Sequence, residues 1–204
     1  MTPEEAAEKV EIRYFTKQGL KIRGVVHVGA NNGYEIEFYL AMGAEKILAF
    51  EPLDSAFTEL LKKYSNEPRV TLMQCALGDF PAEALLNVTS GDGMGSSFLR
   101  EYAGPYIFIG QQSCPIVRFD SLDVDMSPFN TLVVDTQGME MQVLRGFGEK
   151  LKEFEFLNIE CSRSALYEGG YAAQEVIDFL AEQGFQQETP IQDHNDIMFR
   201  RKQC

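Results

Sequence analysis

Residues 25–33, Val-Val-His-Val-Gly-Ala-Asn-Asn-Gly, constrain the fold of this chain more than any other stretch. A valine-rich run leads directly into a turn of small residues, and a second apolar run, residues 47–50, ends at Glu51-Pro52. Strand, tight turn, helix, strand and acid, in that order, are typical of one half of a nucleotide-binding α/β sheet. The turn lets a ligand approach the backbone, and the acid is placed to accept hydrogen bonds from both hydroxyls of a ribose.

The composition is that of an ordinary globular protein. Hydrophobic residues make up 45% of the 204 residues, enough for one domain with a sizeable core. No apolar run approaches the roughly 18 residues that cross a bilayer, and the acidic N-terminus resembles neither a secretory signal nor a transit peptide. The four cysteines contain no C-x-x-C pair, which fits reduced thiols. We therefore expect a cytoplasmic protein with no membrane partner.

The net charge of −13 argues against nucleic acid as a partner, because phosphate binding depends on clustered Lys and Arg. The densest basic run, residues 200–202, is more typical of a solvated tail. An acidic surface fits a neutral or cationic small molecule instead.

Apolar runs separated by turn residues predict alternating strands and helices. An accessory helix within residues 1–20 opens with a capping-box pattern and ends at Gly19. Asp54 is the expected N-cap of a later helix. Strands are predicted at about 23–28, 46–50, 70–76, 131–134, 156–159, 185–188 and 196–201, and helices at about 32–42, 54–64, 139–146 and 172–183. The pattern predicts an α/β fold, a doubly wound and mostly parallel seven-stranded sheet of the Rossmann-like kind whose last strand is antiparallel.

Residues 77–125 are the least regular part of the chain. They contain two short predicted strands, 84–88 and 114–119, and a Gly- and Ser-rich stretch at 89–97. A long irregular insertion in a compact domain is often functional, so we expect a lid or a substrate wall there. No domain boundary is apparent, and residues 1–204 are predicted to form a single domain.

Three acids follow three predicted strands: Glu51, Asp135 and Glu160. In open α/β sheets ligands bind outside the carboxyl ends of the strands, so these side chains should converge on one cleft. The turn itself departs from a dinucleotide fingerprint, because Asn31 and Tyr34 stand where glycines are expected. A looser turn suits a ligand that has no pyrophosphate and carries an amino-acid group and an adenosine, which is S-adenosylmethionine.

Several motifs resemble those of the FkbM-like methyltransferases, a branch of the class I S-adenosylmethionine-dependent enzymes. The resemblance covers about residues 23–201. It is carried by residues 26–33 (Val-His-Val-Gly-Ala-Asn-Asn-Gly), 49–52 (Ala-Phe-Glu-Pro), 76–79 (Ala-Leu-Gly-Asp), the Ser96-Ser97 pair, 119–122 (Phe-Asp-Ser-Leu), 135–146 (Asp-Thr-Gln-Gly-Met-Glu-Met-Gln-Val-Leu-Arg-Gly), 159–160 (Ile-Glu) and 196–199 (Asp-Ile-Met-Phe).

The resemblance implies a role for each candidate residue. The turn would hold the methionine part of the cofactor, Glu51 would accept the ribose hydroxyls, and the apolar pairs after it would flank the adenine. The implied cofactor-binding residues are His27, Gly29, Ala30, Asn31, Asn32, Gly33, Glu51, Pro52, Leu53, Ala76, Leu77 and Asp135. Asp135, Glu160 and His194 are the candidate bases, and the candidate substrate-binding residues are Ser96, Ser97, Gln137 and Glu140.

Two positions depart from the family pattern. His27 stands where the family usually has an acid, and it either binds the amino-acid end of the cofactor or packs in the core. Gln137 replaces the first Glu of D-x-E-G-x-E, which removes a negative charge from the cleft. Glu160-Cys161 stands where related metal-dependent enzymes have Asp-Asn, so no metal is expected.

The sequence thus predicts methylation of a hydroxyl on a small metabolite, sugar or glycan. The motif that follows the predicted strand 131–134 lacks the Asn/Asp-Pro-Pro-Tyr/Phe of enzymes that methylate amino groups of bases. Two alternatives stay open, a nicotinamide-dependent oxidoreductase and a non-catalytic module that binds adenosylmethionine. The oligomeric state is also open.

Overall fold

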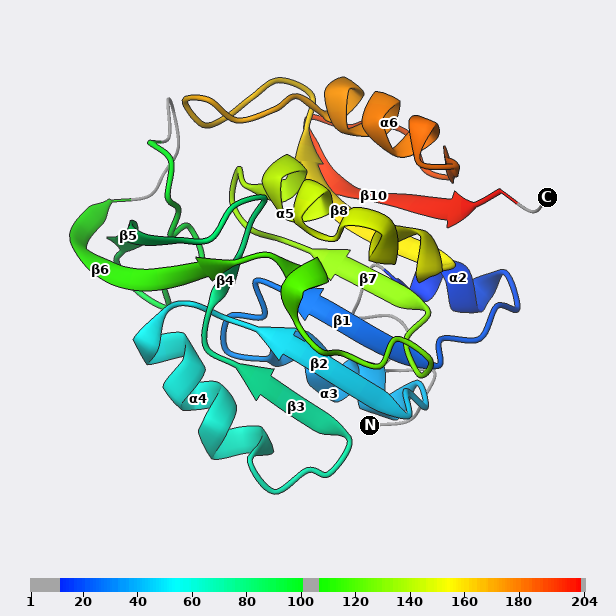
Figure 1. Ribbon diagram of the computed structural model, residues 1–204, viewed down its shortest axis with the longest axis horizontal. Coiled ribbons are helices and arrows are strands. Elements are labelled where there is room, and N and C mark those ends of the chain that lie inside the picture. The colour runs from blue at the N-terminus through cyan, green and yellow to red at the C-terminus, as the bar shows by residue number, and fades with distance from the viewer. Residues whose placement is uncertain (1–11, 101–106, 203–204) are drawn as a thin grey trace.

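A computed structural model of the protein describes residues 12–100 and 107–202 (Figure 1). Seven strands form the central sheet in the order β3-β2-β1-β7-β8-β10-β9. All neighbours are parallel except β10, which is antiparallel to both β8 and β9. The strands are β1 (Gly24–Val28), β2 (Lys46–Phe50), β3 (Val70–Met73), β7 (Thr131–Val134), β8 (Phe156–Ser162), β9 (Phe185–Gln187) and β10 (His194–Arg201). The predicted mostly parallel sheet with an antiparallel last strand is confirmed.

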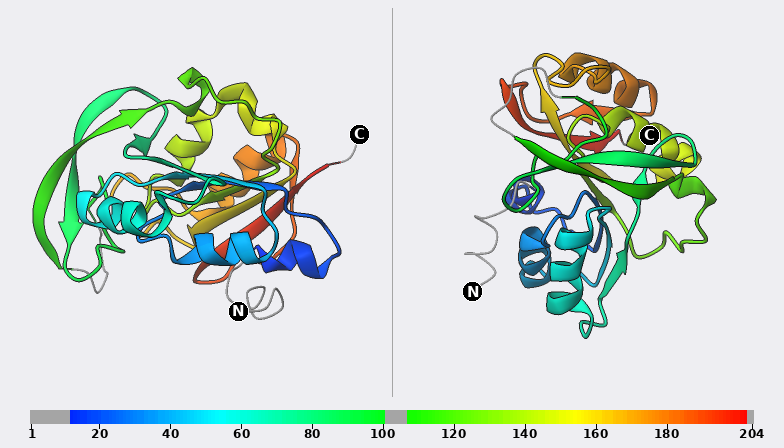
Figure 2. Two further views of the ribbon diagram at one scale, coloured as in Figure 1. Left: turned by 90° about the horizontal axis from the view of Figure 1, so that it is seen from below. Right: turned by 90° about the vertical axis from the view of Figure 1, so that its left-hand side faces the viewer.

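Helices cover both faces of this sheet (Figure 2). One face packs against α2 (Arg13–Lys17), α3 (Tyr34–Ala41) and α4 (Asp54–Tyr64). The other packs against η1 (Phe119–Ser121), α5 (Glu140–Gly146), η2 (Gly148–Glu153) and α6 (Ala173–Glu182). Strand β1 is buried on both faces, since Val25 belongs to the first layer and Val26 to the second. The fold is therefore doubly wound, as expected for strands that read as continuous apolar runs.

A second sheet of three strands projects from one end of the first (Figures 1 and 2). Its order is β4-β6-β5, formed by β4 (Ala76–Leu77), β5 (Ala82–Thr89) and β6 (Phe108–Val117). Leu86 and Cys114 pack against Leu53 and Ala56 at the start of α4. The region predicted to be a loop-rich insertion is thus largely a hairpin, with the Gly- and Ser-rich stretch directly after β5.

Several boundaries differ from the predictions. Strand β3 ends at Met73 rather than residue 76, because the chain then leaves the main sheet to pair with β6. Glu160 lies within β8, not after it, since pairing with β10 continues to Ser162. Asp54 is the first residue of α4, whose N-cap is Leu53. Residues 1–11 of the predicted accessory helix lie outside the described residues, and α2 lies in the remainder of that segment.

Strand register brings several strand ends to one level. Val28 is paired with Phe50 and with Val134, and Val134 is paired with Ile159. The next residue on each strand is Gly29, Glu51, Asp135 or Glu160, and Asp196 of β10 is paired with Glu160. The sequence prediction that the strand-end acids converge is confirmed by this row. No helix among the described residues has the length and apolar character needed to cross a membrane.

Candidate active site

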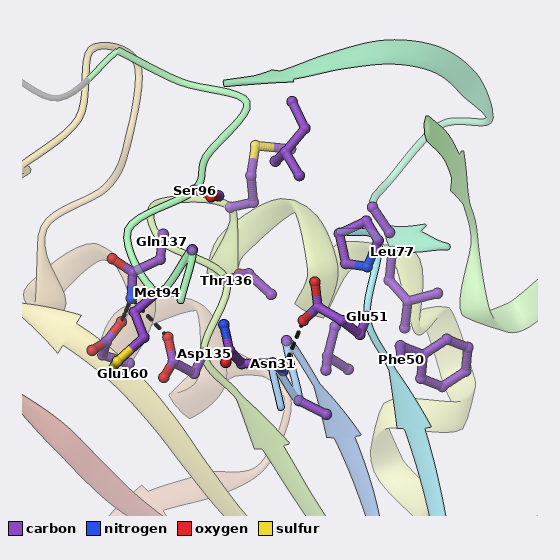
Figure 3. Close-up of a pocket in the computed structure, with 18 of the residues that line it drawn as sticks. Asn31, Phe50, Glu51, Leu77, Met94, Ser96, Asp135, Thr136, Gln137 and Glu160 are labelled. Atoms are coloured by element: carbon purple, nitrogen blue, oxygen red, sulfur yellow. Dashed lines mark hydrogen bonds between the residues drawn. The ribbon is translucent and has the colours of Figure 1, made fainter. Parts of the chain in front are cut away.

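A cavity of about 850 Å³ opens above the row of strand ends. This volume lies in the upper part of the range of roughly 300–1,000 Å³ that small-molecule sites occupy. The wall on one side comes from strands β1, β2, β7 and β8, and on the other from the loop after β5 (Figure 3). Predicted site residues that line it are Gly29, Ala30, Asn31, Asn32, Glu51, Pro52, Ala76, Leu77, Ser96, Asp135, Gln137 and Glu160.

The glycine turn is built by close backbone packing. Gly29 has φ +86°, and a Cβ at this position would overlap the carbonyl oxygen of Asp135. The N–H groups of Gly29 and Ala30 both donate to the Phe50 carbonyl oxygen at 3.0 Å. Gly33, also with positive φ, precedes α3 and makes room for Leu60 and Tyr64 beneath the turn. Gly33 therefore supports the turn and does not line the cavity.

Glu51 is a buried carboxylate whose orientation is fixed by the backbone. Its side chain is 5% exposed. Oε2 accepts the Asn31 N–H and Oε1 accepts the Leu53 N–H, each at 2.8 Å. Burial raises the pKa of Glu51 to about 7, and the two backbone hydrogen bonds oppose that rise. Leu53 is buried beside the cavity and contributes this N–H without lining it.

The Gln137 side chain joins the two other acids of the row. Its Nε2 donates to Oδ1 of Asp135 at 2.9 Å and to Oε2 of Glu160 at 2.7 Å, both drawn as dashed lines in Figure 3. The Tyr167 hydroxyl donates to Gln137 Oε1 at 2.7 Å. Burial and the neighbouring Asp135 carboxylate raise the pKa of Glu160 well above its usual range.

Two further predicted residues hold the Gln137 turn in place. Oε1 of Glu140 accepts hydrogen bonds from the Thr136 N–H, the Thr136 hydroxyl and the Gly138 N–H. Ser97 Oγ donates to the Gln137 carbonyl oxygen at 2.6 Å. Neither Glu140 nor Ser97 lines the cavity, so the structure places both as supports of the turn rather than as substrate contacts.

His27 of β1 lies on the face of the sheet that packs against α3. Its ring is buried under α3, with Nδ1 3.4 Å from the Tyr39 hydroxyl, and it does not line the cavity. Nε2 is 3.4 Å from a Glu35 carboxylate oxygen but has no hydrogen-bond partner. Burial lowers the pKa of His27 to about 4, which leaves the ring neutral at pH 7. Of the two roles foreseen for His27, this placement favours packing.

His194 is the first residue of β10, paired with Ser162. Its side chain lies outside the described part of the structure, so its role as a base stays a prediction.

A family model described as the methyltransferase FkbM domain matches residues 27–186, which is most of the chain. The chain belongs to the FkbM methyltransferase family. It is an S-adenosylmethionine-dependent methyltransferase, and this membership sets aside both the oxidoreductase and the non-catalytic alternative.

Relatives of this FkbM-family enzyme agree with that assignment. The curated 2-O-methyltransferase NoeI of Sinorhizobium fredii is 22% identical over 86% of this chain and 78% of its own length. Among solved structures, 1,6-didemethyltoxoflavin-N1-methyltransferase of Burkholderia thailandensis, with bound S-adenosylhomocysteine, has a TM-score of 0.54 at 11% identity (98% of this chain, 80% of that one). Magnesium protoporphyrin IX methyltransferase of Synechocystis, with bound S-adenosylmethionine, has a TM-score of 0.51 at 11% identity (98% and 79%). At this identity the two structures show the fold alone.

The cavity of this FkbM-family enzyme is also lined by residues that the sequence did not single out. They include Tyr34, Glu35, Asp92, Met94, Phe98, Leu166, Tyr167 and Asp196. Asp196 could have been found from the antiparallel pairing of the last strand with β8, which sets it opposite Glu160. Most of the others stand on irregular loops, where no periodic pattern marks the side that faces the ligand.

Charge in the enzyme's cavity is of one sign. The carboxylate side chains among its described lining residues are Glu35, Glu51, Asp92, Asp135, Glu160 and Asp196, and that lining contains no Lys, Arg or His. A site of this kind complements a cationic sulfur centre and has no cationic side chain, among its described lining residues, to pair with an anionic acceptor.

Proposed function

We propose that the enzyme transfers a methyl group to a hydroxyl of a small uncharged acceptor, a polyhydroxylated metabolite, sugar or glycan. The observation that carries this proposal is the Asp135 carboxylate at the cavity wall, held by the Gln137 amide beside Glu160. An alcohol loses its proton as the new bond forms, so it needs a base in the site. The similarity to NoeI, a 2-O-methyltransferase, supports the same class of acceptor.

The lining residues fit S-adenosylmethionine in one direction along the row. Glu51, with one backbone N–H on each oxygen, has lone pairs left to accept both ribose hydroxyls. Pro52, Ala76 and Leu77 give an apolar wall next to Glu51 for the adenine. The turn at residues 29–32, where a Cβ on Gly29 would clash with Asp135, leaves backbone open to the amino-acid end.

When bound, the cofactor supplies an electrophilic methyl group on a positively charged sulfur. The chain's own contribution is alignment and proton removal, because transfer to oxygen is an in-line displacement. With the cofactor bound, the site would align the acceptor oxygen with the methyl group, and Asp135 would take the proton of the hydroxyl as the methyl group passes from sulfur to oxygen. Asp135 is the favoured base because its Oδ1 is fixed by Gln137.

The charge of the cavity lining also argues against some classes of acceptor. With six acidic side chains and no Lys, Arg or His among its described lining residues, the site has no cationic side chain to pair with a phosphate or carboxylate of an acceptor. This, together with the net charge of −13, supports an acceptor other than nucleic acid. We further propose that residues 1–204 act as one domain in the cytoplasm.

The proposal can be tested without knowing the acceptor in advance. The enzyme is incubated with S-adenosylmethionine labelled with ¹³C in the methyl group and a small-molecule extract, and the products are examined by ¹³C NMR. A new methoxy signal that disappears with Asp135→Asn supports the proposal. A new signal from a methyl on nitrogen, carbon or sulfur contradicts it, and so does undiminished transfer by Asp135→Asn.

A further inference from the structure

The Gln137 amide is matched to three partners at once. Its nitrogen donates to both Asp135 and Glu160, and its oxygen accepts the Tyr167 hydroxyl. A primary amide carries two N–H donors on nitrogen and acceptor lone pairs on oxygen. Each acid therefore receives one N–H, and the amide oxygen accepts the Tyr167 hydroxyl.

Tyr167 fixes the direction in which this amide faces. An ionised carboxylate accepts hydrogen bonds and cannot donate them. A flipped Gln137 amide would set its oxygen against Asp135 and its N–H groups against the tyrosine hydroxyl. The hydrogen bond of 2.7 Å from Tyr167 to Oε1 stabilises the opposite orientation, in which both N–H groups face the acids.

The backbone around Gln137 is shaped for this arrangement. Gln137 has φ +55°, a left-handed conformation that residues other than glycine rarely adopt. Ser97 holds its carbonyl oxygen, and Glu140 holds the N–H groups on either side of it. A Cβ on Gly138 would clash with the Tyr167 ring, so glycine at this position lets the ring approach the amide.

The acid pair lies in a negative environment. Several ionisable groups influence the pair or feel its charge: Glu140 of α5, Cys161 of β8, Asp196 of β10, Glu51 after β2, His27 of β1 and Tyr39 of α3. The ring of His27 is neutral at pH 7, and the described cavity lining holds no Lys or Arg. The Gln137 amide therefore donates to both acids in a site whose described lining supplies no cationic side chain to them.

We propose that Gln137 and Tyr167 are positioning residues for methyl transfer: the Tyr167 hydroxyl orients the Gln137 amide, and the amide holds the Asp135 carboxylate ready to take the acceptor's proton. The inference rests on the proposed function for the role of Asp135. It gives a role to the amide of Gln137. With the glutamate that the family usually has at this position, three carboxylates would meet.

The test compares Tyr167→Phe and Gln137→Met with a matched control, Tyr171→Phe. Tyr171 stands four residues further along the same loop, where its hydroxyl meets Arg145 rather than the acid pair. Full-length protein without ligand, ¹³C-labelled at its carboxyl groups, is titrated by NMR. Loss of a donor should raise the lower apparent pKa of the Asp135–Glu160 pair by about half a unit to one unit in both test variants and leave it unchanged in the control.

Kinetics on the acceptor found by methyl labelling supply the second readout. In Tyr167→Phe, kcat at pH 7 should fall roughly three- to tenfold, with the acidic limb of the rate profile shifted upward and the affinity for S-adenosylhomocysteine unchanged. An unchanged carboxyl titration in Tyr167→Phe overturns the inference, even if Gln137→Met fails to fold. The titration needs no acceptor, so its outcome is independent of whether a hydroxyl is the methylated group.

Discussion

Gly29 and Asp135 meet backbone to backbone, at the ends of neighbouring parallel strands. Gly29 has φ +86°, and any side chain there would overlap the Asp135 carbonyl oxygen. The same contact places both residues side by side in the row of strand ends that lines the cavity. Packing of the fold and placement of the site therefore depend on one glycine.

Gly29→Ala tests this contact against a control with the same backbone conformation. Gly43 also has positive φ (+90°), but a Cβ there would meet nothing within 4 Å. Gly43→Ala should lower the free energy of unfolding by about 1–2 kcal/mol through backbone strain. Gly29→Ala should lower it by about 3–5 kcal/mol, because the neighbouring strand must also move. Urea unfolding measures both, and equal losses would show that the contact with Asp135 is unimportant.

Glu51→Gln should weaken the binding of S-adenosylhomocysteine roughly ten- to hundredfold, because hydrogen bonds to a charged group are among the stronger ones. The glutamine amide also has only one acceptor oxygen, whereas the N–H groups of Asn31 and Leu53 now donate to separate oxygens of Glu51. Calorimetry measures the affinity. Glu59→Gln, at an exposed residue that pairs with Lys62 on α4, is the control and should bind as the parent protein does. Equal affinity in Glu51→Gln would remove Glu51 from the cofactor site.

Cofactor affinity should depend on pH through Glu51. Burial raises the pKa of this carboxyl from 4.5 to about 7, and the ionised form offers the better acceptors. Affinity for S-adenosylhomocysteine should therefore rise roughly tenfold between pH 6 and pH 8, and Glu51→Gln should flatten that rise. The stability of the ligand-free protein should change in the opposite direction. Because the pKa of Glu51 is raised, the free energy of unfolding falls as pH increases from 4.5 to 7. A pH-independent affinity in the parent protein would contradict this assignment.

His27→Leu should separate packing from binding. Burial lowers the pKa of His27 from 6.5 to about 4, so the unfolded chain takes up a proton at higher pH than the folded protein. Stability is retained above pH 6.5 and is lost as pH falls toward 4, by roughly 3 kcal/mol at most. The variant should lose this part of the pH dependence in urea unfolding while keeping its affinity for S-adenosylhomocysteine. Weakened binding in a stably folded variant would place His27 in the site instead.

The strands of the main sheet could be predicted because strands buried on both faces appear in the sequence as short apolar runs. Residues 46–50 and 131–134 are apolar runs that end at acids, and the structure gives them the same bounds. The break after Met73 could not be predicted, since residues 70–77 form one nearly continuous apolar run. Its cause lies elsewhere in the chain: Ala76 and Leu77 pair with Ile116 and Val117 in the second sheet.

The site residues that directly follow strands could be predicted from the sequence, and the others could not. Glu51 and Asp135 follow strands whose register places them at the same level. The face of His27 could not be deduced, because β1 is buried on both sides and its sequence shows no alternation. Tyr167 was missed for a different reason, since its partner Gln137 is reached through a loop with no local pattern.

The most direct test of this account is a crystal structure of the full chain with S-adenosylhomocysteine. We predict the ribose hydroxyls on the Glu51 carboxylate, the amino-acid end against the turn at residues 29–32, and the sulfur facing Asp135. A ligand bound elsewhere, or bound here with Glu51 away from the ribose, would contradict the central claim that this row of strand ends is the cofactor site.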